Sequence, residues 1–569
     1  MITADLQTMV YASILALVTG IPLILAIFSC TPFQKEVIRL LPLATVPALL
    51  APFIVPVDLV VEVPWFFMGG RMGLDQTGRI LLSLSALIWF LASFSSRSLI
   101  ANTTEQTRFF VFFLTAMTGN FGLILASGML GYYLFFALMS FAAYGLVVHE
   151  ATGKALQAGR VYLTLVMIGE VALFTALLLL VHNTGSLAIE DIGGITYQPL
   201  TLALVFIGFG VKIGALPLHG WMTSAYQETP IPAAAVLAGA MVNAGILGWM
   251  RFLPLGQTSY PTAAVLFITV GALAALYGVF IGLQCKEPGA ILGGSSISQM
   301  GLITVIFGLG LLNHKAGFHA APVLVIYVVH HSLAKSSLFF GYDLIKRQGK
   351  TLSHLQIAAI LLPASGLAGL PFTSGAIAKT AFKDLTVTLD GPWYGLSTFF
   401  LPIAAIATTM LMFHFIRILT YGNGTGNPVG RKESRTIFTA SVIATGTILW
   451  VWPAARGSAI HSLAGMNFFQ SLWPVIAGFL LYLIWSRTLS GKKVSPDDRK
   501  KNTHFDLILH TAARVLKKKE WPKLQQDTLF TYLYRIGLQL RRSEKIMGRW
   551  KMIGLSYLAL CLCLLFLLL

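Results

Sequence analysis

The chain has 569 residues, of which 56% are hydrophobic and only 11% charged, and its mean hydropathy is +0.76. This composition excludes an ordinary water-soluble globular protein, and the long uninterrupted apolar runs favour transmembrane helices over a β-barrel. The formal net charge of +18 does not indicate nucleic-acid binding, because the basic residues gather in loops between apolar runs and in one late segment.

Apolar runs of the roughly 20 residues needed to cross a lipid bilayer recur along the chain. They predict an all-α polytopic membrane protein with about sixteen transmembrane helices. The expected spans are 8–28, 38–57, 78–97, 108–127, 130–148, 160–182, 198–218, 233–254, 261–283, 290–312, 319–345, 356–383, 397–420, 436–455, 470–486 and 552–568.

Lys and Arg mark one side of the expected membrane. They gather in the loops after spans one, three, five, eleven, thirteen and fifteen, whereas the loops after spans four and six contain neither. The positive-inside rule places the basic loops in the cytoplasm. We therefore expect a multi-pass protein of the cell inner (plasma) membrane with both termini on the outer, periplasmic face.

Two connecting segments stand out between the spans. The aromatic and glycine-rich loop 63–79 predicts a small external hairpin. Residues 491–550 combine periodic apolar residues with many Lys and Arg, which fits an interfacial amphipathic helix on the cytoplasmic leaflet. A brace lying along other spans or along a neighbouring subunit remains the alternative for this segment.

Most spans contain no internal charge, so the exceptions mark a candidate ion path. A charged side chain at mid-membrane costs at least a few kcal/mol and usually faces water or a partner. These internal ionisable residues are Glu170, Lys212, His330, His331, Lys335 and Lys379. Lysines near span ends, such as Lys346 and Lys383, are instead expected to extend to the membrane interface.

Spans seven and twelve each contain an interior proline. Pro217 follows Lys212 and precedes His219, which we also expect in the ion path, and Pro371 precedes Lys379. Proline removes a backbone donor, which a membrane helix tolerates only beside satisfying neighbours or a hydrated cavity. Two interrupted helices, each with a lysine, predict paired repeats around an ion site at mid-membrane.

The ionisable residues of these spans can relay protons. The proton affinity of a buried lysine changes when a carboxylate approaches or when the surrounding cavity hydrates. Glu170 is the natural candidate partner for Lys212, although it can also be a neutral acid hydrogen-bonded between helices. His330 and His331 beside Lys335 fit a relay better than they fit packing histidines.

Five motifs carry a family resemblance. They are LMSFAAYGLVVHE (138–150), KIGALPLHGW (212–221), SSISQMG (295–301), HSLAKSSLFFG (331–341) and GLPFTSGAIAK (369–379). Together they resemble the antiporter-like subunits shared by respiratory complex I, Mrp-type cation/proton antiporters and membrane-bound hydrogenases, with the first motif most like the hydrogenase-4 and formate hydrogenlyase branch. The resemblance covers roughly residues 75–420.

The resemblance implies two inverted five-helix repeats, broken helices in spans seven and twelve, and a hydrated chain of ionisable residues at mid-membrane. Lys212 would be the central lysine of the first half, Lys335 the connecting lysine and Lys379 the terminal lysine. The expected organisation is N-terminal helices with the hairpin (1–107), a first repeat (108–254), a second repeat (261–420), core helices (421–490), the amphipathic segment (491–550) and a terminal helix (551–569).

The chain departs from the family pattern in its first half. The usual glutamate of span five is replaced by Ala137, Ala238 and Asn243 stand where a histidine or lysine is common, and Tyr327 replaces a histidine. We therefore expect the first half either to be rewired through Glu170 or to have lost conduction.

Three functions are compatible with this sequence. The first is a proton- or cation-translocating subunit of an energy-converting complex, working with other membrane and peripheral subunits. The second is the membrane subunit of a two-component inorganic-carbon uptake system, partnered by a soluble zinc protein. The third is a membrane anchor with static lysine pairs. No flavin, iron–sulfur, quinone or metal motif is present, so no cofactor, metal or catalytic residue is expected, and redox chemistry would belong to partners.

Overall fold

The computed structural model describes residues 2–63, 70–99, 104–348, 354–389, 393, 395–421 and 431–490. The described residues up to Leu489 belong to one compact unit, to which the following description applies. The expected amphipathic segment 491–550 and the expected span 552–568 lie outside the described residues.

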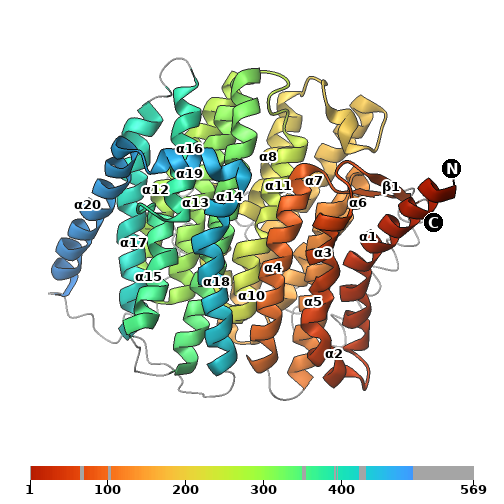
Figure 1. The fold of residues 1–569 in the computed structure, drawn as a ribbon, viewed down its shortest axis with the longest axis horizontal. Helices are drawn as coiled ribbons and strands as arrows, with labels where there is room; N and C mark the ends of the chain where they lie inside the picture. The colour runs from red at the N-terminus through yellow and green to blue at the C-terminus, as the bar shows by residue number, and fades with distance from the viewer. Residues whose placement is uncertain are drawn as a thin grey trace, which may run out of the picture. The chain divides into compact units, whose positions relative to one another are not determined.

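Helices dominate the described chain (Figure 1). They are α1 (Ile2–Phe28), α2 (Gln34–Leu40), α3 (Val46–Ile54), α4 (Gln76–Leu99), α5 (Thr104–Leu125), α6 (Met129–Val147), α7 (Gly153–Thr184), α8 (Pro199–Ile213), α9 (Met222–Glu228), α10 (Ile231–Val236), α11 (Asn243–Phe252), α12 (Pro261–Gln284), α13 (Pro288–Gly310), α14 (His314–Gln348), α15 (His354–Ala368), α16 (Ser374–Val387), α17 (Leu401–Tyr421), α18 (Arg431–Val451), α19 (Arg456–Ser462) and α20 (Gly465–Ser490). Short turns are the 3₁₀ segments η1 (Leu41–Thr45), η2 (Ile189–Ile192) and η5 (Pro453–Ala455) and the π-helical η3 (Leu237–Met241) and η4 (Leu396–Phe400).

Thirteen helical segments of the described chain are long and apolar enough to cross a membrane. Two shorter apolar helices, α8 and α15, fall in the expected spans seven and twelve. Each of the first fifteen expected spans contains helix, so the fold class of a polytopic all-α membrane protein is confirmed. The total of sixteen spans and the two inverted repeats remain predictions.

The centre of the unit is formed by α13, α14 and the run from α10 through η3 to α11, whose membrane-crossing windows are entirely buried. Glycines allow α12 and α13 to pack closely, as small residues do between membrane helices. A Cβ on Gly301 would lie 2.5 Å from the backbone nitrogen of Ala275, and one on Gly278 would lie 2.5 Å from that of Ser298. Side chains on these central helices are therefore shielded from lipid.

A two-stranded hairpin lies at the predicted place but begins earlier than the stretch 63–79: β1 (Val60–Val63) ends where that stretch starts, and β2 (Gly70–Gly73) lies within it. They pair antiparallel, with Val60 opposite Gly73 and Val63 opposite Gly70. Met72 also bridges to Ala126, just beyond the end of α5. The strands therefore join the end of α5 to the start of α4.

Arg251, near the end of α11, fastens the same region. Its guanidinium donates to the carbonyl oxygens of Leu123 (3.2 Å), Ile124 (2.9 Å) and Ala126 (2.9 Å). It also lies 3.4 Å from the carboxylate of Asp75, which precedes α4. One side chain thus satisfies carbonyls that the end of α5 leaves without helical partners.

Candidate ion path

The first broken helix is α8, which carries Lys212 in its last turn. The break begins at Gly214, whose φ of +69° closes the helix in the left-handed conformation. The indole of Trp221 donates to the carbonyl oxygen of Val211 at 2.8 Å, and Ala215 N–H bonds to the carbonyl of Gly210 at 2.9 Å. The chain itself therefore satisfies backbone groups that the break frees inside the membrane, before Pro217 is reached.

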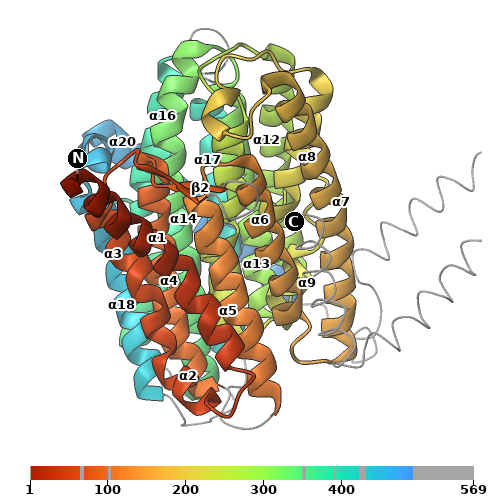
Figure 2. The ribbon, with the colours of Figure 1, turned by 90° about the vertical axis from the view of Figure 1, so that its right-hand side faces the viewer.

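Lys212 is 2% exposed and donates to a neutral oxygen. Its Nζ lies 3.2 Å from the hydroxyl of Tyr162 on α7, which in turn donates to the carbonyl of Ser140 on α6 at 3.1 Å. The helices α7 and α8 lie side by side (Figure 2). The hydrogen bonds from Lys212 thus run through α7 to α6.

Glu170 lies on α7, in the same buried region, but forms no direct pair with Lys212. Neither of its carboxylate oxygens has a hydrogen-bond partner among the described residues. Its carboxylate still interacts electrostatically with Lys212 and lies near Ser140. Lys212 thus gives its hydrogen bond to the hydroxyl of Tyr162 and interacts with Glu170 electrostatically, and the partnership of Glu170 with Lys212 stays a prediction.

Glu170 faces the part of α6 that carries Ala137. Tyr133, Ala137 and Ser140 follow one another at spacings of four and three, so they share one face of α6. Tyr133 and Ser140 both interact with Glu170. The carboxylate on α7 therefore projects toward the helix face on which the sequence lacks its expected glutamate.

Polar side chains on α9 and α13 lie between the two halves. Tyr226 on α9 is fully buried, interacts with Tyr162 and lies near Ser296 on α13. The ammonium of Lys335 on α14 donates to the carbonyl of Leu292, one turn before Ser296, at 2.8 Å. Tyr226 and Ser296 thus lie between the surroundings of Lys212 and those of Lys335.

In the second half, electrostatic interactions link successive ionisable residues. His331 is fully buried and interacts electrostatically with Lys335 and His330. His330 interacts with Lys379 and lies 2.9 Å from the hydroxyl of Ser374, the first residue of α16. The structure therefore brings Lys335, His331, His330 and Lys379 together in this order.

The second broken helix is the pair α15–α16. Helix α15 ends at Ala368, and Gly369 adopts a φ of +86°. Lys379 reaches back from α16 and donates to the carbonyl of Ala368. A Cβ on Gly369 would lie 2.6 Å from the Cδ of Lys379, so only glycine leaves room for this contact.

Both breaks place a lysine at the carboxyl end of a half-helix. Lys212 lies in the last turn of α8, and Lys379 bonds to the last residue of α15. The carboxyl end of a helix dipole stabilises a cation. The two interrupted spans therefore share a physical design, since each offers a lysine the negative end of a helix inside the membrane.

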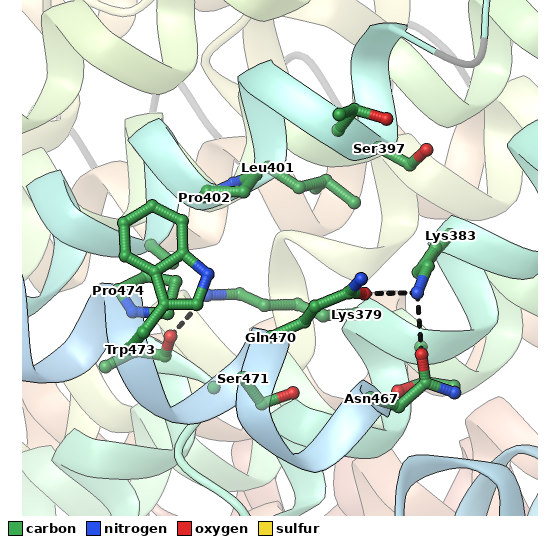
Figure 3. A pocket seen from close by; sticks show the side chains of 15 residues that line it. Lys379, Lys383, Ser397, Leu401, Pro402, Asn467, Gln470, Ser471, Trp473 and Pro474 are labelled. Atoms are coloured by element: carbon green, nitrogen blue, oxygen red, sulfur yellow. Dashed lines mark hydrogen bonds between the residues drawn. The ribbon is translucent and has the colours of Figure 1, made fainter. Parts of the chain in front are cut away.

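Lys379 lines a cavity of about 200 Å³ (Figure 3). The walls come from α15, α16, η4, α17 and α20. Lys383, which the sequence placed at the membrane interface, also lines this cavity. Its ammonium donates to the side-chain oxygen of Asn467 at 2.6 Å and to that of Gln470. The extension of Lys383 to the membrane interface stays a prediction, and α20 provides amide acceptors for its ammonium beside the cavity.

Three further residues singled out in the sequence contact neighbouring helices. His219 lies in the break after α8, where its ring packs against Tyr277 of α12 with centroids 5.2 Å apart. Asn243 donates to the hydroxyl of Ser332 on α14 at 2.9 Å, so it joins α11 to the central helix. The hydroxyl of Tyr327 donates to the side-chain oxygen of Gln299 at 3.1 Å.

Sequence reasoning missed several members of the site: Tyr162, Tyr226, Ser296, Lys383, Asn467 and Gln470. One of them carried a usable signal, since Lys383 follows Lys379 by four residues and therefore shares its helix face. The others are ordinary polar residues whose importance depends on the helix that faces them.

Comparison with known proteins agrees with this architecture. Residues 126–407 match the family described as NADH:quinone oxidoreductase/Mrp antiporter, TM. This stretch, just under half of the chain, is therefore similar to the antiporter-like membrane family. The match includes both broken helices and all six internal ionisable residues.

Two curated relatives illustrate the range of this antiporter-like family. The chain is 30% identical over 218 residues to hydrogenase-4 component B of Escherichia coli, covering 36% of this chain and 32% of that protein. It is 28% identical over 356 residues to NADH-quinone oxidoreductase subunit N of Desulforudis audaxviator, covering 58% and 68% respectively. The chain spans less than half the length of several curated relatives that it matches.

A solved structure shares the fold. The Mrp complex of Dietzia sp. DQ12-45-1b contains a chain with a TM-score of 0.71 and 20% identity, matched over 93% of this chain and 62% of that chain. At this level of identity the likeness concerns the antiporter-like fold alone.

Proposed function

We propose that this chain is a proton- or cation-translocating, antiporter-like subunit of a multisubunit energy-converting membrane complex. The observation that carries the proposal is a succession of buried polar atoms that lack hydrogen-bond partners among the described residues. They are the carboxylate of Glu170, the hydroxyls of Tyr226, Ser295 and Ser296, both ring nitrogens of His331, and Nε2 of His330.

Such atoms indicate internal water. An unsatisfied buried polar group costs about 1–3 kcal/mol, so native proteins usually satisfy it with ordered water. The unsatisfied atoms occupy α7, α9, α13 and α14, between Lys212 and Lys379. Water beside them would connect the three lysines into a chain along which protons move by exchange.

The lysines and histidines take distinct roles in this proposal. Lys212, Lys335 and Lys379 hold protons, and His330 and His331 transfer them between the last two lysines. Glu170 supplies the acid that α6 lacks at Ala137. Water between Glu170 and Lys212 couples their charges without a direct hydrogen bond.

Substitution of the second-half lysines tests this function. In the complex purified with its native partners and reconstituted into liposomes, Lys335→Ala and Lys379→Ala should each reduce ion translocation at least tenfold. Translocation is measured with a pH-sensitive dye enclosed in the liposomes. Unchanged translocation in both variants would contradict the proposal.

The relatives favour this function over inorganic-carbon uptake, because those described above are hydrogenase and quinone-oxidoreductase components. We propose that the partners are other membrane and peripheral subunits, and that the chain resides in the inner membrane with both termini outside. Purification in mild detergent separates the alternatives. Co-purified redox subunits support the proposal, whereas a soluble zinc protein supports carbon uptake.

A further inference from the structure

Lys383 is an ionisable residue of the Lys379 cavity. It follows Lys379 by one helical turn on α16, and both lysines line the same 200 Å³ space. Figure 3 shows the ammonium of Lys383 directed toward Asn467 and Gln470 of α20, to both of which it donates hydrogen bonds. The amine is therefore held beside the cavity rather than directed freely toward water.

The other walls of this cavity provide neutral polar groups. Thr380 on α16, Ser397 and Thr398 near η4, and Ser471 on α20 contribute hydroxyls. Among the residues that line the cavity, only the two lysines are charged. Protonation of one lysine therefore disfavours protonation of the other, because like charges one turn apart repel.

Two further ionisable groups lie beyond Lys383. The carboxylate of Asp384, the next residue on α16, lies 3.1 Å from Nδ1 of His461 on α19. Both side chains are more than one-third exposed. The backbone carbonyl of His461 accepts a hydrogen bond from Asn467, which also binds Lys383, so the exposed pair and the cavity share one residue.

These groups form an ordered exit from the buried lysine. Lys379 is the innermost group, Lys383 lies one turn nearer the end of α16, and the Asp384–His461 pair is exposed at that end. The described lining from η4, α17 and α20 adds no titratable group. Lys383 therefore lies between Lys379 and the exposed Asp384–His461 pair along α16.

We propose that Lys383 exchanges protons between Lys379 and the aqueous phase at the face where α16 ends, while Asn467 and Gln470 hold its amine at the cavity. This inference rests on the proposed function, because it assigns the exchange residue of the same path. It requires a side chain that both binds and releases a proton, not merely a positive charge.

A charge-matched series tests this requirement in the complex reconstituted into liposomes. Lys383→Arg keeps the charge and hydrogen-bond donors but does not release its proton near neutral pH. We expect Lys383→Arg and Lys383→Gln each to slow translocation at least tenfold. Lys315→Arg and Lys315→Gln, at an exposed lysine at the start of α14, provide matched controls and should retain the wild-type rate.

Chemical rescue separates proton exchange from structure. Lys383→Cys is made with Cys30, Cys285, Cys561 and Cys563 replaced by serine, and is then modified with aminoethyl methanethiosulfonate, which restores a titratable amine. This modification should recover most of the rate, whereas the trimethylammonium reagent, with a fixed charge, should not. A wild-type rate in Lys383→Arg, or equal rescue by both reagents, would overturn the inference.

The same assay distinguishes the two proposals. If Lys379→Ala abolishes translocation while Lys383→Arg does not change it, the proposed function stands and only the role of Lys383 fails. If the wild-type complex does not translocate ions, the proposed function fails first.

Discussion

At the scale of single residues, Gly369 illustrates how backbone conformation positions a charge. Its φ of +86° disfavours any residue with a Cβ, and the space that a Cβ would need is occupied by Lys379. The glycine therefore leaves the space that the lysine occupies, although the two are ten positions apart in the chain.

Gly369→Ala should impair translocation by displacing Lys379 from the end of α15. We expect at least a tenfold loss in rate while the protein still extracts and elutes as a folded complex. Gly457→Ala on α19 is the matched control, since a Cβ there has no atom within 4 Å. A normal rate in Gly369→Ala would show that the lysine does not need this position.

The role of Glu170 as the acid that interacts with Lys212 can be tested by moving the carboxylate from α7 to α6. Glu170→Ala should reduce translocation, because no other carboxylate interacts with Lys212 among the described residues. Adding Ala137→Glu should restore part of the rate, since Ala137 shares the face of α6 that approaches Glu170. Failure of this rescue, with the double variant folded, would argue against interchangeable acids.

His149 gives stability a defined pH dependence. It lies just beyond the end of α6, where burial, and secondarily the charge of Arg108, lowers its pKa to about 4. The folded state therefore holds it neutral at pH values at which the unfolded chain, with an ordinary histidine pKa of about 6.5, binds a proton.

The stability that depends on neutral His149 is fully present above pH 6.5 and is lost as the pH falls toward 4. Thermal unfolding of the detergent-solubilised protein should show this loss, and His149→Phe should reduce it. An identical pH dependence in wild type and variant would assign the acid sensitivity to other groups.

At the scale of elements, Arg251 at the end of α11 holds the end of α5 next to the start of α4. Arg251→Gln removes donors from the carbonyls of Leu123, Ile124 and Ala126, and an unsatisfied buried group costs about 1–3 kcal/mol. We expect a lower unfolding temperature of the protein in detergent. Arg435→Gln, at an exposed site on α18, should leave that temperature unchanged.

The sequence predicted correctly which two spans are interrupted, but it predicted the wrong residue as the cause of the first interruption. Pro217 and Pro371 drew attention to spans seven and twelve, and both spans are interrupted. In α8, however, the helix ends at Ile213 and is closed by Gly214, three positions before Pro217. The glycine closes the helix, and the indole of Trp221 donates a hydrogen bond to the freed carbonyl of Val211. Only the folded chain reveals this hydrogen bond.

At the scale of the whole molecule, landmarks of the site were predictable but their connections were not. A lysine in an apolar run is conspicuous in any sequence, which is why Lys212, Lys335 and Lys379 could be named. The acceptor of Lys212, Tyr162, is 50 residues away, and the acceptors of Lys383 are 84 and 87 residues away. Such partners depend on how the helices pack. Periodicity within one helix shows which residues share a face but not which other helix lies against that face.

The uneven burial of the helices also has a mechanical consequence. In α13 the whole membrane-crossing window is buried, whereas in α20, which provides the amide wall of the Lys379 cavity, only 17% of that window is buried. Most of α20 contacts lipid or a neighbouring subunit rather than the rest of this chain. Lateral pressure from the lipid or the neighbour therefore reaches the cavity through this helix. Bilayer thickness, or a neighbouring subunit pressing on α20, would therefore set the width of the cavity and so adjust conduction without touching the lysines.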